Sequence, residues 1–221
     1  MKNEVDKKTA SAGGVLVCFA LKEEKTAFQK IAEHNAGVSI LVTGIGQKNA
    51  EKSVRDFLAG KTPTRVLTCG FAGALVSDLP IGAVVFETED ARLREALTAA
   101  GARPAKFHCA DRIATTSREK QELRQSTKAD AVEMESGVIS SICREQGLPC
   151  ATVRVISDTV DEDLPLDFNQ LGKPDRSMDY GKLAWAVAKA PGKIGALRRL
   201  QKQTRFAAEQ LAAVLAKVIF P

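Results

Sequence analysis

Short apolar runs alternate with amphipathic segments along most of the chain. The first run, GVLVCFAL at 14–21, is bounded by glycine and charged residues, as is typical of a buried strand. The next segment, KEEKTAFQKIAEH at 22–34, has the spacing of apolar positions that predicts a helix. The same reading predicts further strands at 38–46, 65–75, 81–90, 105–111, 129–135 and 149–158. It predicts further helices at 47–60, 91–102, 115–127 and 136–147, with two or more closing the chain from about Lys182.

Strands that alternate with helices and are apolar without strict alternation predict an α/β fold. We expect a single domain with a central, mostly parallel mixed sheet flanked by helices. The domain is expected over 14–181, after a disordered leader at 1–13. The basic segment 182–221 is expected to be a helical extension of it, and the polar stretch 161–181 a lid or a connector.

Composition and charge exclude several classes of protein. The 221 residues are 44% hydrophobic and 27% charged, as in ordinary globular domains. Residues 182–221 contain eight Lys or Arg and one Glu, so the body carries −2 of the total charge of +5 and no basic face for a nucleic acid. The five cysteines lack CxxC spacing, and no secretory signal or span of about 18 apolar residues is present. These features favour a cytoplasmic protein with reduced thiols.

Chemistry-bearing residues gather where the predicted strands end, the edge of such sheets at which ligands bind. These segments are 22–24, 44–46, 70–73, 111–112, 133–135 and 157–158, and they contain several acids, several glycines and few basic groups. That mixture favours a polyhydroxyl ligand and acid–base chemistry over a bare polyphosphate. GIGQKN lacks the third glycine of a dinucleotide-binding turn, since Asn49 stands there, and His34 and His108 are too scattered for a metal site.

The segment ADAVEMES is the least ordinary of these. Glu133 and Glu135 stand on either side of Met134, where apolar residues would be expected. At a strand end the two carboxylates share a face, and a carboxylate there can accept two hydrogen bonds from a vicinal diol such as that of ribose. Asp158 has an alternative role as the cap of a following helix, and Glu24 as a solvated acid in a first helical turn.

Five segments occur together in an order and spacing that resemble a known family. They are FALKEE, LVTGIGQKNA, TCGFAGAL followed by IGAVV, ADAVEMES and VRVISDTVD. From about Gly14 to Ala190, the chain is similar to the nucleoside phosphorylase/nucleosidase superfamily, which contains methylthioadenosine/adenosylhomocysteine nucleosidase. The regions 110–136 and 185–211 look most like hopanoid-associated nucleoside phosphorylases, which act on an adenosyl group attached to a polycyclic lipid.

The resemblance implies cleavage of the N-glycosidic bond of a purine nucleoside, with a 5′-modified adenosine as the expected substrate and no cofactor. Glu24 matches the carboxylate that activates the attacking water. Glu135 matches the group that holds the 2′- and 3′-hydroxyls, with Met134 against the sugar and Glu133 in support.

The resemblance also implies a site for the base. Asp158 matches the acid that protonates purine N7, oriented by Ser157, and burial is expected to keep it protonated near neutral pH. Small residues that let the backbone approach the ligand are matched by Gly44, Ala72 and Gly73. Asp111 and Ile113 match the edge of the base pocket.

Departures from the family pattern leave alternatives open. Ile113 replaces a base-stacking aromatic residue, which weakens the assignment of adenine. Phe71 stands near a usual serine, and the turn after the first strand offers no arginine for phosphate, so water is favoured over phosphate as the nucleophile. A phosphorylase with phosphate as co-substrate and a non-catalytic nucleoside-binding protein are the alternatives. The stretch after IGAVVFE is shorter than in relatives, which leaves a more open site and puts the expected homodimer in doubt.

The basic tail has two interpretations. Ile194, Leu197, Leu200, Phe206, Leu211, Leu215 and Val218 recur at roughly helical period. The favoured interpretation is a helix packed on the body with a solvated basic face. The alternative is a peripheral membrane contact, which would bring the enzyme to a lipid-linked nucleoside.

Overall fold

The computed structural model describes residues 14–171, 189 and 191–220. The predicted leader at 1–13 and much of the stretch 161–181 therefore lie outside the described residues. The elements are β1 (Val15–Phe19), α1 (Lys22–Ala32), β2 (Val38–Val42), α2 (Gln47–Leu58), β3 (Arg65–Ala74), β4 (Val84–Thr88), α3 (Ala91–Ala99), β5 (Arg103–Pro104), β6 (Phe107–Cys109), α4 (Ser117–Thr127), β7 (Ala131–Glu133), α5 (Ser136–Glu145), β8 (Cys150–Asp158) and α7 (Ile194–Ile219). Single 3-10 turns lie at Phe168–Leu171 and Pro191–Lys193.

The strands form one eight-stranded mixed sheet, in which β2, β1, β3, β8, β4 and β5 lie side by side in that order. β7 pairs with β3 and β6 at one end. Most pairings are parallel, whereas β4 runs antiparallel to β8 and β7 antiparallel to β3. The predicted fold class, a single α/β domain with a mostly parallel mixed sheet, is confirmed.

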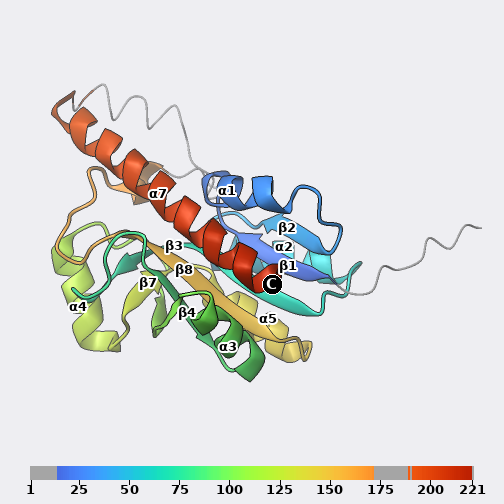
Figure 1. Ribbon diagram of the computed structural model, residues 1–221. Coiled ribbons are helices and arrows are strands. Elements are labelled where there is room, and N and C mark those ends of the chain that lie inside the picture. Colours follow the sequence, from blue (N-terminus) through green and yellow to red (C-terminus); the bar gives the residue numbers. More distant parts are fainter. Residues whose placement is uncertain (1–13, 172–188, 190, 221) are drawn as a thin grey trace, which may run out of the picture.

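Both faces of the sheet are covered, which explains the unbroken apolar runs of the strands (Figure 1). Along β1, Val17 and Phe19 pack into a core shared with α1, α3 and α7. The alternate residues Leu16 and Cys18 pack into a second core with α2 and α5. The carboxyl ends of β1, β3 and β8 therefore meet at one edge, between two layers of helices.

The structure corrects the sequence reading at the β5–β6 edge. The strand predicted at 105–111 is confined to Phe107–Cys109, and the short strand β5, Arg103–Pro104, was not predicted. Both residues of β5 are exposed, and a proline cannot donate to a central ladder, so this strand carries neither the apolar pattern nor the residue types of a core strand.

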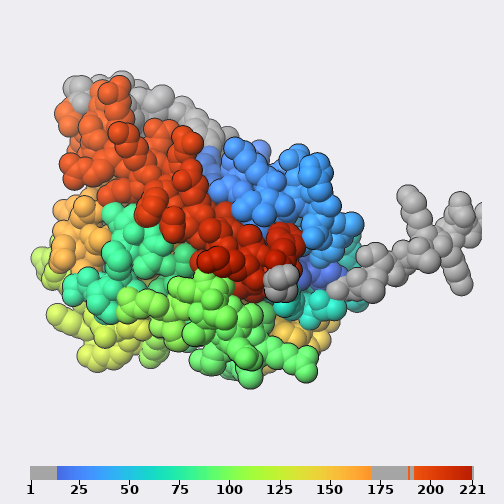
Figure 2. All heavy atoms as spheres, in the orientation of Figure 1, coloured from blue at the N-terminus to red at the C-terminus, as the bar shows by residue number. Residues whose placement is uncertain are grey.

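The end of the described chain is one long helix. Two or more helices were predicted from about Lys182, but α7 is a single 26-residue helix, and residues 182–188 lie outside the described part. Figure 2 shows α7 across the surface between α1 and α3. One face of its second half is buried, with Leu211, Leu215 and Val218 in the same core as β1.

For its described part, α7 has the packed arrangement that was favoured. Most of its apolar stripe faces the body, with Ile194 and Phe206 left exposed among basic residues. Charge, rather than a free apolar face, would therefore have to attract a lipid surface, and peripheral membrane contact stays a prediction. Within the described residues no helix is both long and apolar enough to span a bilayer.

Candidate active site

A cavity of about 420 Å³ opens at the carboxyl ends of β1, β3 and β8. This volume is in the range of pockets for small organic ligands. The cavity brings together residues that lie more than 130 positions apart in the sequence. The predicted site residues that line it are Glu24, Phe71, Ala72, Gly73, Ile113, Glu133, Met134, Glu135, Ser157 and Asp158.

Two predicted site residues do not line this cavity. Asp111 faces a neighbouring cavity that His108 also lines, and its carboxylate accepts a 3.3 Å hydrogen bond from Gln47. Gly44 lies one residue before the lining residue Ile45, and its φ of +82° serves the turn that follows β2. The residues that follow Asp111, Arg112 and Ile113, do line the cavity, and a role for Asp111 at the edge of a base pocket stays a prediction.

Glu24 lies in the first turn of α1 and points inward. One carboxylate oxygen accepts a hydrogen bond from the Leu21 amide at 2.8 Å, and the other from the Phe71 amide at 2.9 Å. The first contact is the glutamate half of a capping box, so local helix chemistry fixes the side chain. Only 4% of Glu24 is exposed, and burial raises its pKa above the ordinary value. Glu24 is thus a rigid carboxylate of increased basicity.

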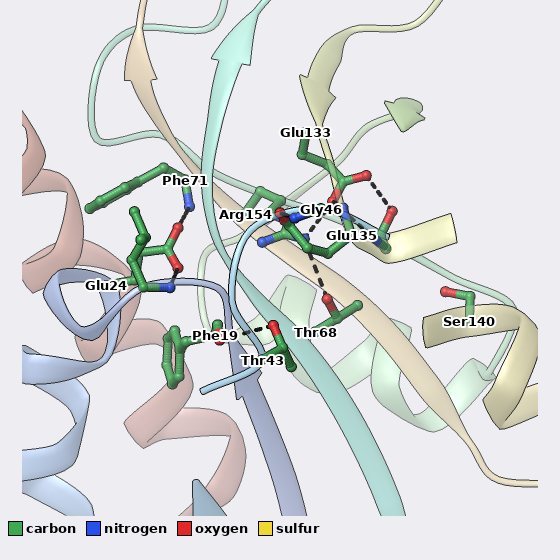
Figure 3. Close-up of polar contacts among 12 residues, drawn as sticks. Phe19, Glu24, Thr43, Gly46, Thr68, Phe71, Glu133, Glu135, Ser140 and Arg154 are labelled. Atoms are coloured by element: carbon green, nitrogen blue, oxygen red, sulfur yellow. Dashed lines mark hydrogen bonds and ion pairs between the residues drawn. The ribbon is translucent and has the colours of Figure 1, made fainter. Parts of the chain in front are cut away.

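Arg154 occupies the centre of the acidic cluster, between Glu24 on one side and Glu133 and Glu135 on the other (Figure 3). Its Nη2 donates to Glu133 and lies 3.4 Å from a carboxylate oxygen of Glu135. The guanidinium of Arg154 lies over Gly70, its neighbour on β3. A Cβ at that position would lie 2.5 Å from Nη1 of Arg154 and 2.6 Å from a Glu24 oxygen, which explains the glycine.

Glu133 is held by hydrogen bonds from its neighbours in the chain. Its oxygens accept hydrogen bonds from the amides of Glu135 and Ser136 and from the Ser136 hydroxyl. Burial opposes its ionisation, but Arg154 and these donors outweigh burial and lower the pKa of Glu133 below its ordinary value. Glu133 is therefore ionised and fully engaged with the protein, which suits a positioning role.

Glu135 is the more available carboxylate. One oxygen accepts a 2.8 Å hydrogen bond from the Gly46 amide, and the residue precedes α5 directly. Burial raises its pKa to about 7, because the nearby Arg154 only partly offsets the loss of solvent and the neighbouring carboxylates oppose ionisation. A carboxylate held in this way binds hydroxyl donors readily once they replace the missing water.

The raised pKa of Glu135 makes stability depend on pH. Between about pH 4.5, the ordinary pKa, and about pH 7, the folded protein retains a proton that the unfolded chain has lost. The free energy of unfolding therefore falls as pH rises through this window. We expect Glu135→Gln, which cannot ionise, to unfold at a higher temperature than wild type at pH 8. The advantage should disappear near pH 5 in thermal unfolding scans.

The matched control is Glu95→Gln, an exposed glutamate on α3. Its unfolding temperature should follow that of wild type at both pH values. A gain in Glu135→Gln that persists unchanged at pH 5, or no gain at pH 8, would contradict the prediction.

Asp158 ends β8 and receives a donor on each oxygen. The Ser157 hydroxyl donates to Oδ1 at 2.7 Å, and Nζ of Lys120 lies 2.6 Å from Oδ2. Lys120 comes from α4 and has no exposed surface. The sequence analysis expected burial alone to keep Asp158 protonated. The structure adds the buried ammonium group of Lys120, which the sequence did not indicate, and the protonation of Asp158 stays a prediction.

Two buried cations, Arg154 and Lys120, thus belong to a site in which few basic groups were expected. Arg154 left a signal in the sequence, since a charged residue interrupts the apolar strand 150–158. The sequence gives no comparable indication for Lys120, because its helix is polar on all sides and any of its charged residues could have faced solvent.

Much of the remaining cavity wall is apolar. The described part of the predicted lid or connector contributes Leu164 and Phe168, and Asn169 holds Ile113 through two backbone hydrogen bonds of 2.9 and 3.0 Å. From α7, Leu197 and Leu200 close the opposite side. Acids at one end and hydrocarbon at the other suit a ligand with a polar ring and an apolar substituent. Within residues 14–171, 189 and 191–220, no cluster of three or more His, Cys, Asp or Glu side chains could bind a metal ion.

Sequence comparisons give a consistent set of relatives. A model of the phosphorylase superfamily matches residues 87–188. A 5′-methylthioadenosine/S-adenosylhomocysteine nucleosidase of Actinobacillus succinogenes is 30% identical over 185 residues, which cover 66% of this chain and 80% of the relative. An aminodeoxyfutalosine nucleosidase of Helicobacter pylori strain 26695 is 24% identical over 184 residues, covering 64% and 76%.

Solved structures share the fold. The 5′-methylthioadenosine/S-adenosylhomocysteine nucleosidase of Neisseria meningitidis, in complex with methylthio-immucillin-A, superposes with a TM-score of 0.68 at 21% identity, covering 94% of this chain and 99% of that one. The native futalosine hydrolase of Helicobacter pylori strain 26695 gives 0.67 at 18% identity, covering 92% and 97%.

Proposed function

The chain belongs to the nucleoside phosphorylase/nucleosidase superfamily, and on that premise we propose that it hydrolyses the N-glycosidic bond of a purine nucleoside, with a 5′-modified adenosine as the preferred substrate. The observation that carries this proposal is the convergence of Glu24, Glu135 and Asp158 on one cavity. Their carboxylates come from α1, the start of α5 and the end of β8.

In the proposed reaction, the sugar lies over Met134 and the carboxylate of Glu135 accepts hydrogen bonds from its 2′- and 3′-hydroxyls. Glu24 takes a proton from a water molecule as that water attacks C1′. The raised pKa of Glu24 makes it a stronger base than an exposed glutamate. As the bond to the base breaks, positive charge develops on the ribose, and the nearby carboxylates stabilise it.

The electron pair of the glycosidic bond goes to the base, which needs a proton at N7. Asp158 is the proposed donor, with its carboxyl group oriented by Ser157. General acid assistance of this kind is worth about 10²–10⁴-fold in rate. Ala72 and Gly73 leave the neighbouring backbone of β3 open to the base.

The charges in the cavity favour water over phosphate as the nucleophile. Five acidic residues line the cavity: Glu23, Glu24, Glu133, Glu135 and Asp158. Arg154 is engaged by Glu133 and Glu135, and the lining residue Arg112 pairs with Glu119 at 2.6 Å. A phosphate dianion would meet more like charge than free cations at this point.

The apolar part of the cavity wall favours a nucleoside that carries a substituent on its 5′ carbon. Two of the relatives above are named 5′-methylthioadenosine/S-adenosylhomocysteine nucleosidases, and these names place a sulfur substituent at this position of their substrates. In this chain, Leu164, Phe168, Leu197 and Leu200 offer a hydrocarbon surface of the required kind. A long or lipid-linked group on the 5′ carbon would cover the most of this hydrocarbon surface.

The test is release of free base, measured by chromatography. The purified protein is incubated with adenosine, methylthioadenosine, adenosylhomocysteine, inosine and a 5′-alkylthioadenosine, each with and without inorganic phosphate. We expect base release without phosphate, fastest from the 5′-thio compounds. Glu24→Gln should lose about 10²-fold or more of this rate, because the water is no longer activated.

Glu33→Gln, an exposed glutamate at the other end of α1, is the control and should keep the wild-type rate. Release only in the presence of phosphate would replace hydrolysis by phosphorolysis. Binding of these nucleosides without release of base would leave a binding protein instead.

A further inference from the structure

Lys120 has no assigned role in the proposed reaction, yet it is the most completely enclosed charge near the cavity. Its Nζ lies 2.6 Å from Oδ2 of Asp158 and donates to the carbonyls of Thr159 at 2.7 Å and Glu162 at 2.8 Å. An ammonium group has three N–H donors, so all three have an acceptor. The loop after β8 and the helix α4 thus hold this amine at one fixed place, behind Asp158.

This arrangement raises a difficulty for the base-protonating step. A leaving purine needs a proton, but Asp158 lies between the Lys120 ammonium group and the Ser157 hydroxyl, so both of its oxygens are already engaged by donors. The proton available within hydrogen-bonding distance of Oδ2 is on Nζ of Lys120.

We propose that Lys120 and Asp158 act as one acid, with Lys120 as the source of the proton that reaches the leaving base. The inference rests on the proposed function. The proton moves from Nζ to Oδ2 of Asp158, and the carboxyl group passes a proton to N7 while the N-glycosidic electron pair goes to the base. Lys120 is left as a neutral amine and regains its proton from water after the products leave.

The physical reason for the transfer is desolvation. An ion pair loses more solvation free energy than a neutral amine–carboxylic acid pair when a ligand covers it. Lys120 is already buried, and Asp158 is 8% exposed, so a bound base would remove the remaining water. Nearby carboxylates are engaged elsewhere: Glu119 binds Arg112, and Asp163 accepts from the Ser117 amide. The pair can therefore exchange a proton without a competing acceptor among these groups.

The experiment compares two leaving groups. A purine nucleoside that the wild type cleaves needs a proton on its base, whereas 4-nitrophenyl β-D-ribofuranoside releases a weakly basic phenolate that needs none. Lys120→Met should lose about 10²–10⁴-fold in kcat on the purine nucleoside and less than about fivefold on the nitrophenyl riboside. Arg118→Met removes an exposed cation from the same helix and should leave both rates unchanged.

A second variant separates charge from proton supply. Lys120→Arg keeps the positive charge, but a guanidinium does not give up its proton in proteins. It should show the same selective loss as Lys120→Met, with folding checked by circular dichroism and by a thermal shift on adding adenine. Equal losses on both substrates would mean a structural role, and an unchanged purine rate would mean no role. Either result overturns the proposal.

The pH dependence of the wild-type rates also tests whether Lys120 supplies the proton. Both substrates make the same contacts through their ribose. The effect of these contacts therefore cancels in the ratio of kcat for the purine nucleoside to kcat for the nitrophenyl riboside. If the pair supplies the proton, we expect this ratio to stay constant from about pH 5 to 7. A ratio that falls steadily across this range would assign the proton to a lone carboxyl group. If the wild type cleaves neither substrate, it is the proposed function that fails, which is a different outcome.

Discussion

Replacing Arg154 by methionine is expected to lower the free energy of unfolding by about 3–5 kcal/mol at pH 7, the usual result of removing one partner from a buried ionic network. Arg154 is 1% exposed and is the cation shared by Glu133, Glu135 and Glu24. Methionine fills much of the volume, so the loss reflects charge rather than a cavity. Glu133 suffers most, because its pKa is lowered chiefly by Arg154.

The measurement is urea unfolding at several pH values. The loss in Arg154→Met should shrink as pH falls below about 4.5, the ordinary pKa of a glutamate, because protonation removes the buried negative charges. The control is Arg55→Met, which breaks a half-exposed contact with Glu51 and Glu145 and should cost about 1 kcal/mol or less. A loss in Arg154→Met no larger than that of the control would mean that the buried network does not stabilise the fold.

The sequence predicted the architecture well, because the fold depends on signals that are local. Runs such as 15–19 and 65–74 are apolar on both faces, and each is followed by a segment of helical period. The failures are where such signals are missing. Strand β5 has two residues, both exposed, so it adds nothing to the apolar pattern.

The site was predicted from carboxylates and glycines, and the structure brings most of them to one cavity. What could not be predicted is how their charges are balanced. Arg154 lies in the middle of β8, a central strand of the sheet. Its side chain interacts there with the carboxylates of Glu24 in α1 and Glu133 in β7. Lys120 reaches Asp158 only through the packing of α4 under the loop 159–162. Such long-range pairings leave no periodic pattern in a single sequence.

This balance changes how the acids of the site should be viewed. Each carboxylate has a different environment: Glu133 is ionised and saturated with donors, while burial raises the pKa of Glu135 to about 7 and also raises that of Glu24. Groups whose environments push their pKa values apart can divide structural, sugar-binding and base roles among them. Arg154 lowers the pKa of all three, but burial outweighs it at Glu24 and Glu135.

Asp158→Asn is expected to reduce the release of a purine base by about 10²–10⁴-fold. The amide can keep the local hydrogen bonds, since its oxygen can accept from Lys120 and its NH₂ group can donate to Ser157. It cannot pass a proton to N7. We therefore expect kcat to fall while KM for the nucleoside changes little, as measured by steady-state release of base.

Asp161→Asn, an exposed change three residues further along the chain, should leave kcat and KM at their wild-type values. The nitrophenyl riboside again separates chemistry from folding, because Asp158→Asn should cleave it nearly as fast as wild type. A KM that rises with kcat unchanged would make Asp158 a binding group for the base rather than its acid. In that case Lys120 would serve to fix the orientation of this carboxylate, and the proton for the base would have to come from bound water.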